Sequence, residues 1–164
     1  MTLHADLLRQ AATLAILDPR RPQQANLRRS ISASYYALFH MLTDEAAARL
    51  VRGTNRQAHR NYVRRRFEHG PMRRIAKAWV QPSIPQWLAD SGISPGTDLR
   101  LVASAFERLQ ELRHRADYDH ATSFARADAQ AAIELTEEAF AAWGRIRTEP
   151  AADFFLITLL LPAR

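Results

Sequence analysis

The sequence of 164 residues contains no cysteine and only five glycines. Without cysteine, neither a disulfide framework nor a thiolate zinc site can form. The few glycines build neither a phosphate-binding loop nor a dinucleotide-binding fingerprint, so we expect no cofactor. The longest apolar run, Phe154–Leu161, is too short to span a bilayer as a helix. No basic segment followed by an apolar run opens the chain. These absences predict a soluble, cytoplasmic protein without membrane association.

Lysine is almost absent as well, because Lys77 is the only one, and arginine supplies nearly all of the positive charge. The formal net charge is +6. Arginine is concentrated between residues 52 and 77, where Glu68 is the only acid. Such a basic patch typically binds nucleic acid, since arginine makes bidentate contacts with phosphate. The alternative is a solvated helix face. The predicted nucleic-acid-binding residues are Arg60, Arg64, Arg65, Arg66, Arg73 and Arg74.

Apolar residues recur at steps of three and four through most of the chain, which predicts helices and no strand. We expect helices over residues 2–17, 22–50, 55–69, 72–79, 98–119 and 127–146. The fold class is therefore predicted as an all-α, antiparallel bundle of four or five helices. Residues 1–148 would form this bundle. Residues 149–164 would be an apolar tail that packs on the bundle or on a dimer partner.

Proline and glycine set the expected boundaries of these helices. Pro22 is expected in the first turn of the second helix, and Gly70-Pro71 is expected to stop the third. Thr97 or Asp98 would cap the helix over residues 98–119. The long connection between residues 80 and 96 should be pinned to the core by a single turn at Trp87 and Leu88.

The stretch Leu109–His120 carries polar residues along what is otherwise an apolar stripe. The stripe of Leu99, Val102, Phe106 and Leu109 continues into Arg113, Ala116, Asp117 and His120. In an unbroken helix, Arg113 and His120 lie about 20° apart, whereas Arg115 and His120 lie about 140° apart. A buried arginine is costly unless it is paired or faces a cleft. We therefore expect Arg113 and His120 to share a face, unless a kink near Tyr118 brings Arg115 into that position.

A second polar line runs along the helix over residues 22–50. It consists of Arg28, Ser32, Tyr36 and His40, at steps of four. This line is expected to face a cleft or a partner helix. The alternative is a set of semi-buried polar groups that satisfy one another.

Several catalytic chemistries are excluded by spacing. His59 and His69 lie ten residues apart, so they cannot share a helix face as zinc ligands, and no histidine pair has metalloprotease spacing. No nucleophile elbow is present. His114 and Tyr118 form an i, i+4 pair on the outer side of their helix. We therefore expect no metal site.

Two segments, RRSISASYYALFHML and later LRHRADYDH, resemble in order and spacing the HEPN domain family (higher eukaryotes and prokaryotes nucleotide-binding domain). The resemblance covers roughly residues 5–147. It implies a short stand-alone bundle that dimerises with its motif helix facing its copy across a cleft. Active members look like metal-independent endoribonucleases, often toxins neutralised by a nucleotidyltransferase-type antitoxin.

The family motif is an arginine, four to six residues, then a histidine, which Arg115 and Arg113 both satisfy with His120. The resemblance implies that His120 transfers a proton while an arginine, Arg113 on helical geometry, stabilises phosphate charge. Asp117 would orient one of them. Some family toxins carry a modified tyrosine two residues after the histidine, and here Thr122 takes that place, so we do not expect that regulation.

The candidate catalytic residues are therefore Arg113, Asp117 and His120. Arg115, Tyr118, Ser32, Tyr36 and His40 are the candidate lining residues of the cleft. Two alternatives remain open: a purely structural Arg113–Asp117 pair, and a non-catalytic HEPN module that binds a nucleotidyltransferase partner or nucleic acid.

Overall fold

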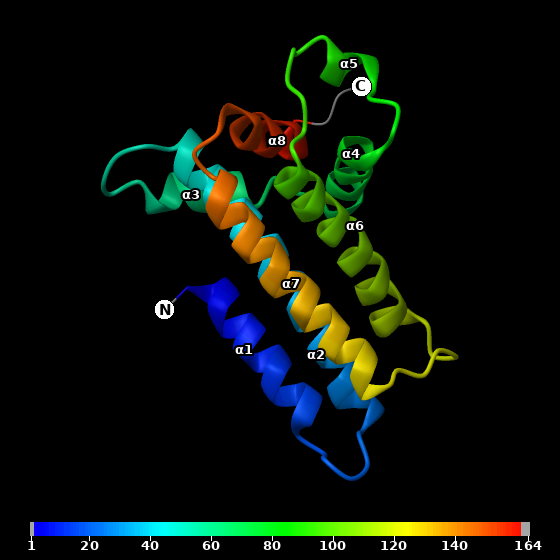
Figure 1. Ribbon diagram of the computed structural model, residues 1–164. Coiled ribbons are helices and arrows are strands. Elements are labelled where there is room, and N and C mark those ends of the chain that lie inside the picture. The colour runs from blue at the N-terminus through cyan, green and yellow to red at the C-terminus, as the bar shows by residue number, and fades with distance from the viewer. Residues whose placement is uncertain (1, 162–164) are drawn as a thin grey trace.

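The computed structural model describes residues 2–161, and over this range the chain forms eight helices and no strand (Figure 1). In chain order the helices are α1 (Leu3–Ile16), α2 (Gln24–Leu50), α3 (Gln57–Arg64), α4 (His69–Val80), α5 (Gln86–Ala89), α6 (Thr97–Tyr118), α7 (Arg126–Ile146) and α8 (Pro150–Leu160). The prediction of an all-α helical bundle is confirmed. Residue 1 lies outside the described residues, and so do residues 162–164, the last three of the predicted apolar tail.

Helix α2 is the centre of the bundle, because α1, α6 and α7 all pack against it (Figure 1). Small side chains let its neighbours approach closely, and the buried hydroxyls among them are satisfied by backbone carbonyls. Ser30 donates to the carbonyl of Ala11 in α1 at 2.8 Å, and Ser34 donates to the carbonyl of Ser30 at 3.0 Å. A helix that is buried on most sides needs this arrangement, since no face of it is left for unsatisfied polar groups.

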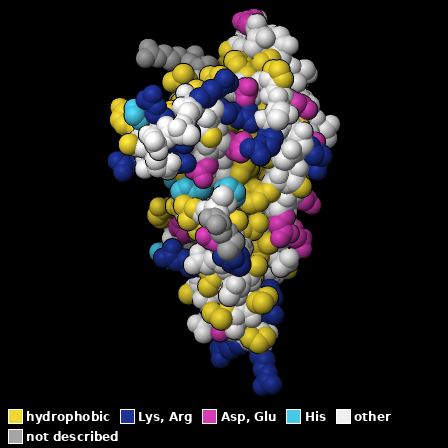
Figure 2. All heavy atoms as spheres, turned by 90° about the vertical axis from the view of Figure 1, so that its left-hand side faces the viewer, with side chains coloured by type: hydrophobic (Ala, Val, Ile, Leu, Met, Phe, Trp, Pro, Cys, Tyr) yellow, Lys and Arg dark blue, Asp and Glu magenta, His cyan; other side chains and the backbone are white. Residues whose placement is uncertain are grey.

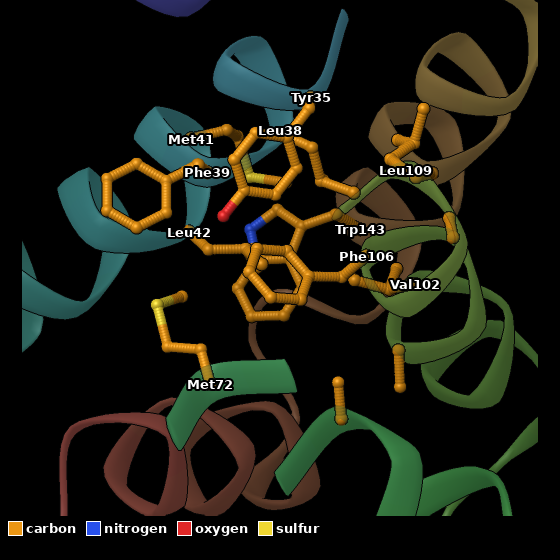
Figure 3. Packing of buried hydrophobic residues seen from close by; sticks show 14 of the residues in the cluster. Tyr35, Leu38, Phe39, Met41, Leu42, Met72, Val102, Phe106, Leu109 and Trp143 are labelled. Carbon is orange, nitrogen blue, oxygen red and sulfur yellow. The ribbon is translucent and has the colours of Figure 1, made fainter. Parts of the chain in front are cut away.

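The apolar core lies where α2, α4, α6 and α7 converge (Figure 3). Large side chains from all four helices meet there: Tyr35, Leu38 and Leu42 of α2, Met72 of α4, Phe106 and Leu109 of α6, and Trp143 of α7. The core therefore fixes the middle of α6 against the middle of α2.

Helix α8 packs on α2 and α4. The Trp79 indole, which is fully buried, donates to the hydroxyl of Thr158 at 3.1 Å, and its ring centroid lies 5.3 Å from that of Phe155. The expected single turn in the long connection is also present as α5, where Leu88 is fully buried. Both segments close the end of the bundle that lies opposite the α6–α7 connection (Figure 1).

The expected helix over residues 55–69 is wrong in its extent. α3 ends at Arg64, and α4 already begins at His69, so Gly70 and Pro71 lie in the first turn of α4 rather than ending α3. Proline is tolerated in a first turn because the amide it lacks would have no partner within the helix. Phe67, in the link between the two helices, is buried in the core.

Two predicted starts of helices also differ from the structure. α6 begins at Thr97 with Gly96 as its N-cap, and no side chain caps it, so neither Thr97 nor Asp98 has the predicted role. Asp98 instead accepts two hydrogen bonds from the Arg145 guanidinium, at 2.6 and 2.9 Å. Pro22 precedes α2, which begins at Gln24.

Candidate functional site

Arg113 lies inside the bundle, near the end of α6. Its residue surface is 8% exposed, as its place on the apolar stripe predicted. The guanidinium carbon lies 5.4 Å from the ring centroid of Tyr35 and 5.9 Å from those of Tyr36 and Tyr118. These contacts are cation–π interactions, which partly compensate a buried cation.

Asp117 links Arg113 to α2. One carboxylate oxygen accepts from the Arg113 guanidinium at 3.4 Å, and the other accepts from the Ser32 hydroxyl at 2.5 Å. Burial lowers the pKa of Arg113, but Tyr36, Tyr35 and Asp117 outweigh this and raise it overall, so the guanidinium stays charged. The structure therefore brings Arg113, Asp117 and Ser32 together through the Asp117 carboxylate. Nε of Arg113 is buried, and among the described residues it has no hydrogen-bond partner.

His120 does not continue the face that carries Arg113, because α6 ends at Tyr118. Asp119, the C-cap, has φ −92° and ψ 95°, which is extended backbone. The seven-residue argument that paired Arg113 with His120 required an unbroken helix, and that condition is not met. His120 is exposed in the turn that follows α6, and among residues 2–161 no hydrogen bond or ion pair involves its side chain.

Arg115, the second candidate for the motif arginine, is exposed on the last turn of α6. Its guanidinium carbon lies 5.9 Å from the ring centroid of Phe124, beyond the turn. Tyr118 is also exposed, and its ring lies 5.1 Å from that of His114, on the outer side of α6 as expected. Arg115 and His120 are therefore both accessible at this end of the molecule, whereas Arg113 is buried.

Successive residues of the predicted polar line of α2, each one helical turn apart, contact α6. Arg28 binds the carbonyls at the end of α6, Ser32 binds Asp117, and Tyr36 lies against the Arg113 guanidinium. His40 lies one turn further on, with its ring 6.4 Å from that of Tyr36. Burial lowers the pKa of His40, and Asp44 opposes this effect. The line thus faces a neighbouring helix over three of its four positions.

Tyr35 and His69 are functional candidates that the sequence did not reveal. The Tyr35 hydroxyl lies 2.6 Å from Nδ1 of His69, and Gln110 donates to the backbone carbonyl of His69 at 2.8 Å. Burial raises the pKa of Tyr35 and lowers that of His69, which the Arg113 charge lowers further. A neutral imidazole that accepts from a protonated hydroxyl fits both shifts. Spacing gave no signal, because α4 brings His69 to the site from a different part of the chain.

The basic residues of α3 lie far from the His120 turn. Arg64 forms an ion pair with Asp44, sixteen residues beyond Arg28 along α2, which at 1.5 Å per residue is about 24 Å. Arg60 donates to the carbonyls of Val51 and Gly53. Both arginines therefore brace the α2–α3 connection.

Other predicted nucleic-acid-binding residues are more accessible. Arg65, Arg66 and Arg74 are exposed, and the Arg66 guanidinium stacks on Tyr62 with 4.7 Å between the guanidinium carbon and the ring centroid. Arg73 pairs with Glu111 of α6 at 3.3 Å. Figure 2, which views the α1 and α3 side, shows Lys and Arg side chains interspersed with acidic ones in its upper half and gathered again at its lower tip.

Within residues 2–161, no group of three or more His, Asp or Glu side chains lies close enough to hold a metal ion. The same part of the chain has no helix that is both long and apolar enough to cross a membrane. The candidate site is therefore the end of α6 and the turn that follows it, where arginine, histidine and carboxylate side chains are the groups that could take part in a reaction.

No protein-family model matches the chain, and neither the curated proteins nor the solved structures compared with it contain a significant match.

Proposed function

We propose that the protein is a metal-independent endoribonuclease of the HEPN type, in which His120 and Arg115 contact the scissile phosphate. The observation that carries the proposal is the end of α6. There an imidazole and a guanidinium are both exposed, in the spacing of the HEPN motif. Arg115 replaces Arg113 as the preferred motif arginine, because Arg113 is buried and paired with Asp117.

The proposed reaction follows from the chemistry of these groups. An RNA 2′-hydroxyl attacks the adjacent phosphate, and the 5′-oxygen of the next nucleotide leaves. His120 accepts the proton of the 2′-hydroxyl, and a proton returns from it to the leaving 5′-oxygen, since an imidazole can act as both a general base and a general acid. Arg115 stabilises the negative charge on the phosphate oxygens. Arg113 and Asp117 act beneath them by holding the last turn of α6 against Ser32 of α2.

The same proposal predicts how the helices are arranged and how two copies of the protein assemble. The four long helices would form a HEPN-like antiparallel bundle, and two copies would bring their α6 ends together across a cleft that holds RNA. Arg65, Arg66, Arg73 and Arg74 would attract the RNA backbone by charge. A nucleotidyltransferase-type antitoxin would be the partner if the protein acts as a toxin.

The test is incubation of the purified protein with RNA in EDTA, comparing wild type with His120→Ala and Arg115→Ala. Loss of a proton-transfer group should reduce cleavage by about 10²–10⁴-fold. His59→Ala and Arg108→Ala are matched controls, because both residues are exposed and lie away from the α6 end. Cleavage that requires metal, or that survives His120→Ala, would refute the proposal. Loss of activity in Arg113→Met but not in Arg115→Ala would return the motif role to Arg113.

A second candidate function is a non-catalytic module that binds RNA or a protein partner. The observation in its favour is that Asp117 bonds both Arg113 and Ser32, as in a structural ion pair. This function predicts RNA binding that persists unchanged in His120→Ala, with no cleavage by wild type.

A further inference from the structure

Arg28 of α2 binds the backbone on both sides of His120. Its guanidinium donates to the carbonyl of Ala116 at 2.8 Å and to that of Asp119 at 3.0 Å. It also donates to the carbonyl of Thr122, and its carbon lies 5.4 Å from the centroid of the Phe124 ring. One side chain thus ties the end of α6, its C-cap and the far side of the turn to α2.

This arrangement satisfies groups that a helix leaves unpaired. The last four carbonyls of a helix have no partner within it and carry the negative end of the helix dipole. A guanidinium suits them, because its five donors are held in a rigid plane and can serve several carbonyls at once. The charge and shape of Arg28 both match the end of α6.

Two further contacts close the turn. Asp119 accepts with one carboxylate oxygen from the amides of Ala121 and Thr122, at 3.0 and 3.3 Å. Gln24, one helical turn before Arg28 in α2, exchanges two hydrogen bonds with the backbone of Phe124, at 2.7 and 2.9 Å. The backbone around His120 is therefore fixed from α2, although the imidazole itself is exposed.

We propose that Arg28 is the positioning residue of the site: it holds the turn that presents His120, and it does so without contact with the substrate. This inference rests on the proposed function for the role of His120, but the hold of Arg28 on the turn can be measured whether or not RNA is cleaved.

The first arm of the test measures amide hydrogen exchange in Arg28→Met, which keeps the length of the side chain and removes its donors. Exchange at Ala121 and Thr122 should accelerate by about tenfold or more, since several hydrogen bonds to a charged group are lost. Amides in the middle of α2 and α7 should stay protected within about threefold if only the turn opens. Arg29→Met is the matched control, because Arg29 is the exposed neighbour on the same helix.

The second arm measures RNA cleavage. In Arg28→Met, kcat should fall by about tenfold or more with KM nearly unchanged, because an orienting group affects the reacting geometry more than binding. Arg28→Lys should recover only part of the activity, since an ammonium cannot span the three carbonyls. Added methylguanidinium should restore cleavage by Arg28→Ala but not by His120→Ala.

The outcomes are distinct. Unchanged exchange at Ala121 and Thr122 in Arg28→Met overturns the inference, and so does faster exchange with unchanged cleavage. If wild type does not cleave RNA, the proposed function fails, and the exchange data alone decide whether Arg28 holds the turn. Faster exchange in the control Arg29→Met would also count against it, because the effect would then be general to α2.

Discussion

Replacing Asp117 with alanine should destabilise the protein markedly, because it leaves the Arg113 guanidinium buried without its carboxylate. The Arg113 side chain is 10% exposed and that of Asp117 is 24% exposed. Arg113 cannot respond by losing its proton, because a guanidinium stays protonated in proteins. The variant therefore leaves a buried positive charge with only the cation–π contacts of the neighbouring tyrosine rings, such as Tyr35 and Tyr36.

The magnitude follows from the geometry. Breaking a fully buried ion pair costs about 3–5 kcal/mol, and the partial exposure of Asp117 lets water screen part of that cost, which leaves about 2 kcal/mol. The lost hydrogen bond from Ser32 adds about 1 kcal/mol. The expected loss in the free energy of unfolding is thus about 3 kcal/mol.

Urea denaturation with a double-variant cycle measures this quantity. Arg113→Met removes the charge and keeps the packing, so it should cost little, as apolar replacements of buried pairs often do. The double variant Arg113→Met/Asp117→Ala should be more stable than Asp117→Ala alone by about 2 kcal/mol. A loss below about 1 kcal/mol in Asp117→Ala, or a double variant as unstable as the sum of the singles, would refute the electrostatic reasoning.

Three further predictions concern other parts of the bundle. Burial, followed by a neighbouring guanidinium and a second histidine, lowers the pKa of His69 below its usual 6.5. The unfolded chain therefore binds more protons in acid. Stability should be fully present above about pH 6.5 and decline as the pH falls, and His69→Gln should flatten this decline in urea titrations at several pH values. Trp79→Ala should cost about 3–5 kcal/mol by thermal or urea unfolding. Thr158→Val removes the acceptor of the indole and the bond that the hydroxyl donates to the Phe155 carbonyl, and it should cost about 1–3 kcal/mol; equal costs would be inconsistent with the packing of α8. If RNA binds the basic residues, Arg65→Ala should lower the slope of log affinity against log salt by about 0.7, while Arg64→Ala should mainly lower stability. A slope changed only by Arg64→Ala would contradict the assignment of Arg64 to Asp44.

Helix positions were predictable from the sequence where the signal was local. The apolar stripe through Phe106 and Leu109 continues into a buried Arg113, as the periodicity required. Gly70-Pro71 gave the wrong boundary, because such a pair can end one helix or begin the next, and here both residues lie in the first turn of α4. Glycine and proline indicate a break between helices, but they do not show on which side of the break a helix lies.

The site was predictable only in part. The four-residue line of Arg28, Ser32 and Tyr36 showed that one face of α2 is polar, but their partners could not be inferred. The prediction that linked Arg113 to His120 assumed a continuous helix, which α6 does not provide beyond Tyr118. A helix end is decided by competition between the next intrahelical bond and contacts from elsewhere, here the carbonyl bonds made by Arg28.

The sequence by itself therefore determined the long helices, the buried arginine and the polar face of α2, because each depends on residues within a few turns of one another. Only the tertiary structure decided that Arg28 holds the turn at Asp119 and that Tyr35 meets His69. Those pairs are far apart along the chain and form when the core brings α2, α4 and α6 together. No local spacing encodes them, since their geometry is set by how whole helices pack.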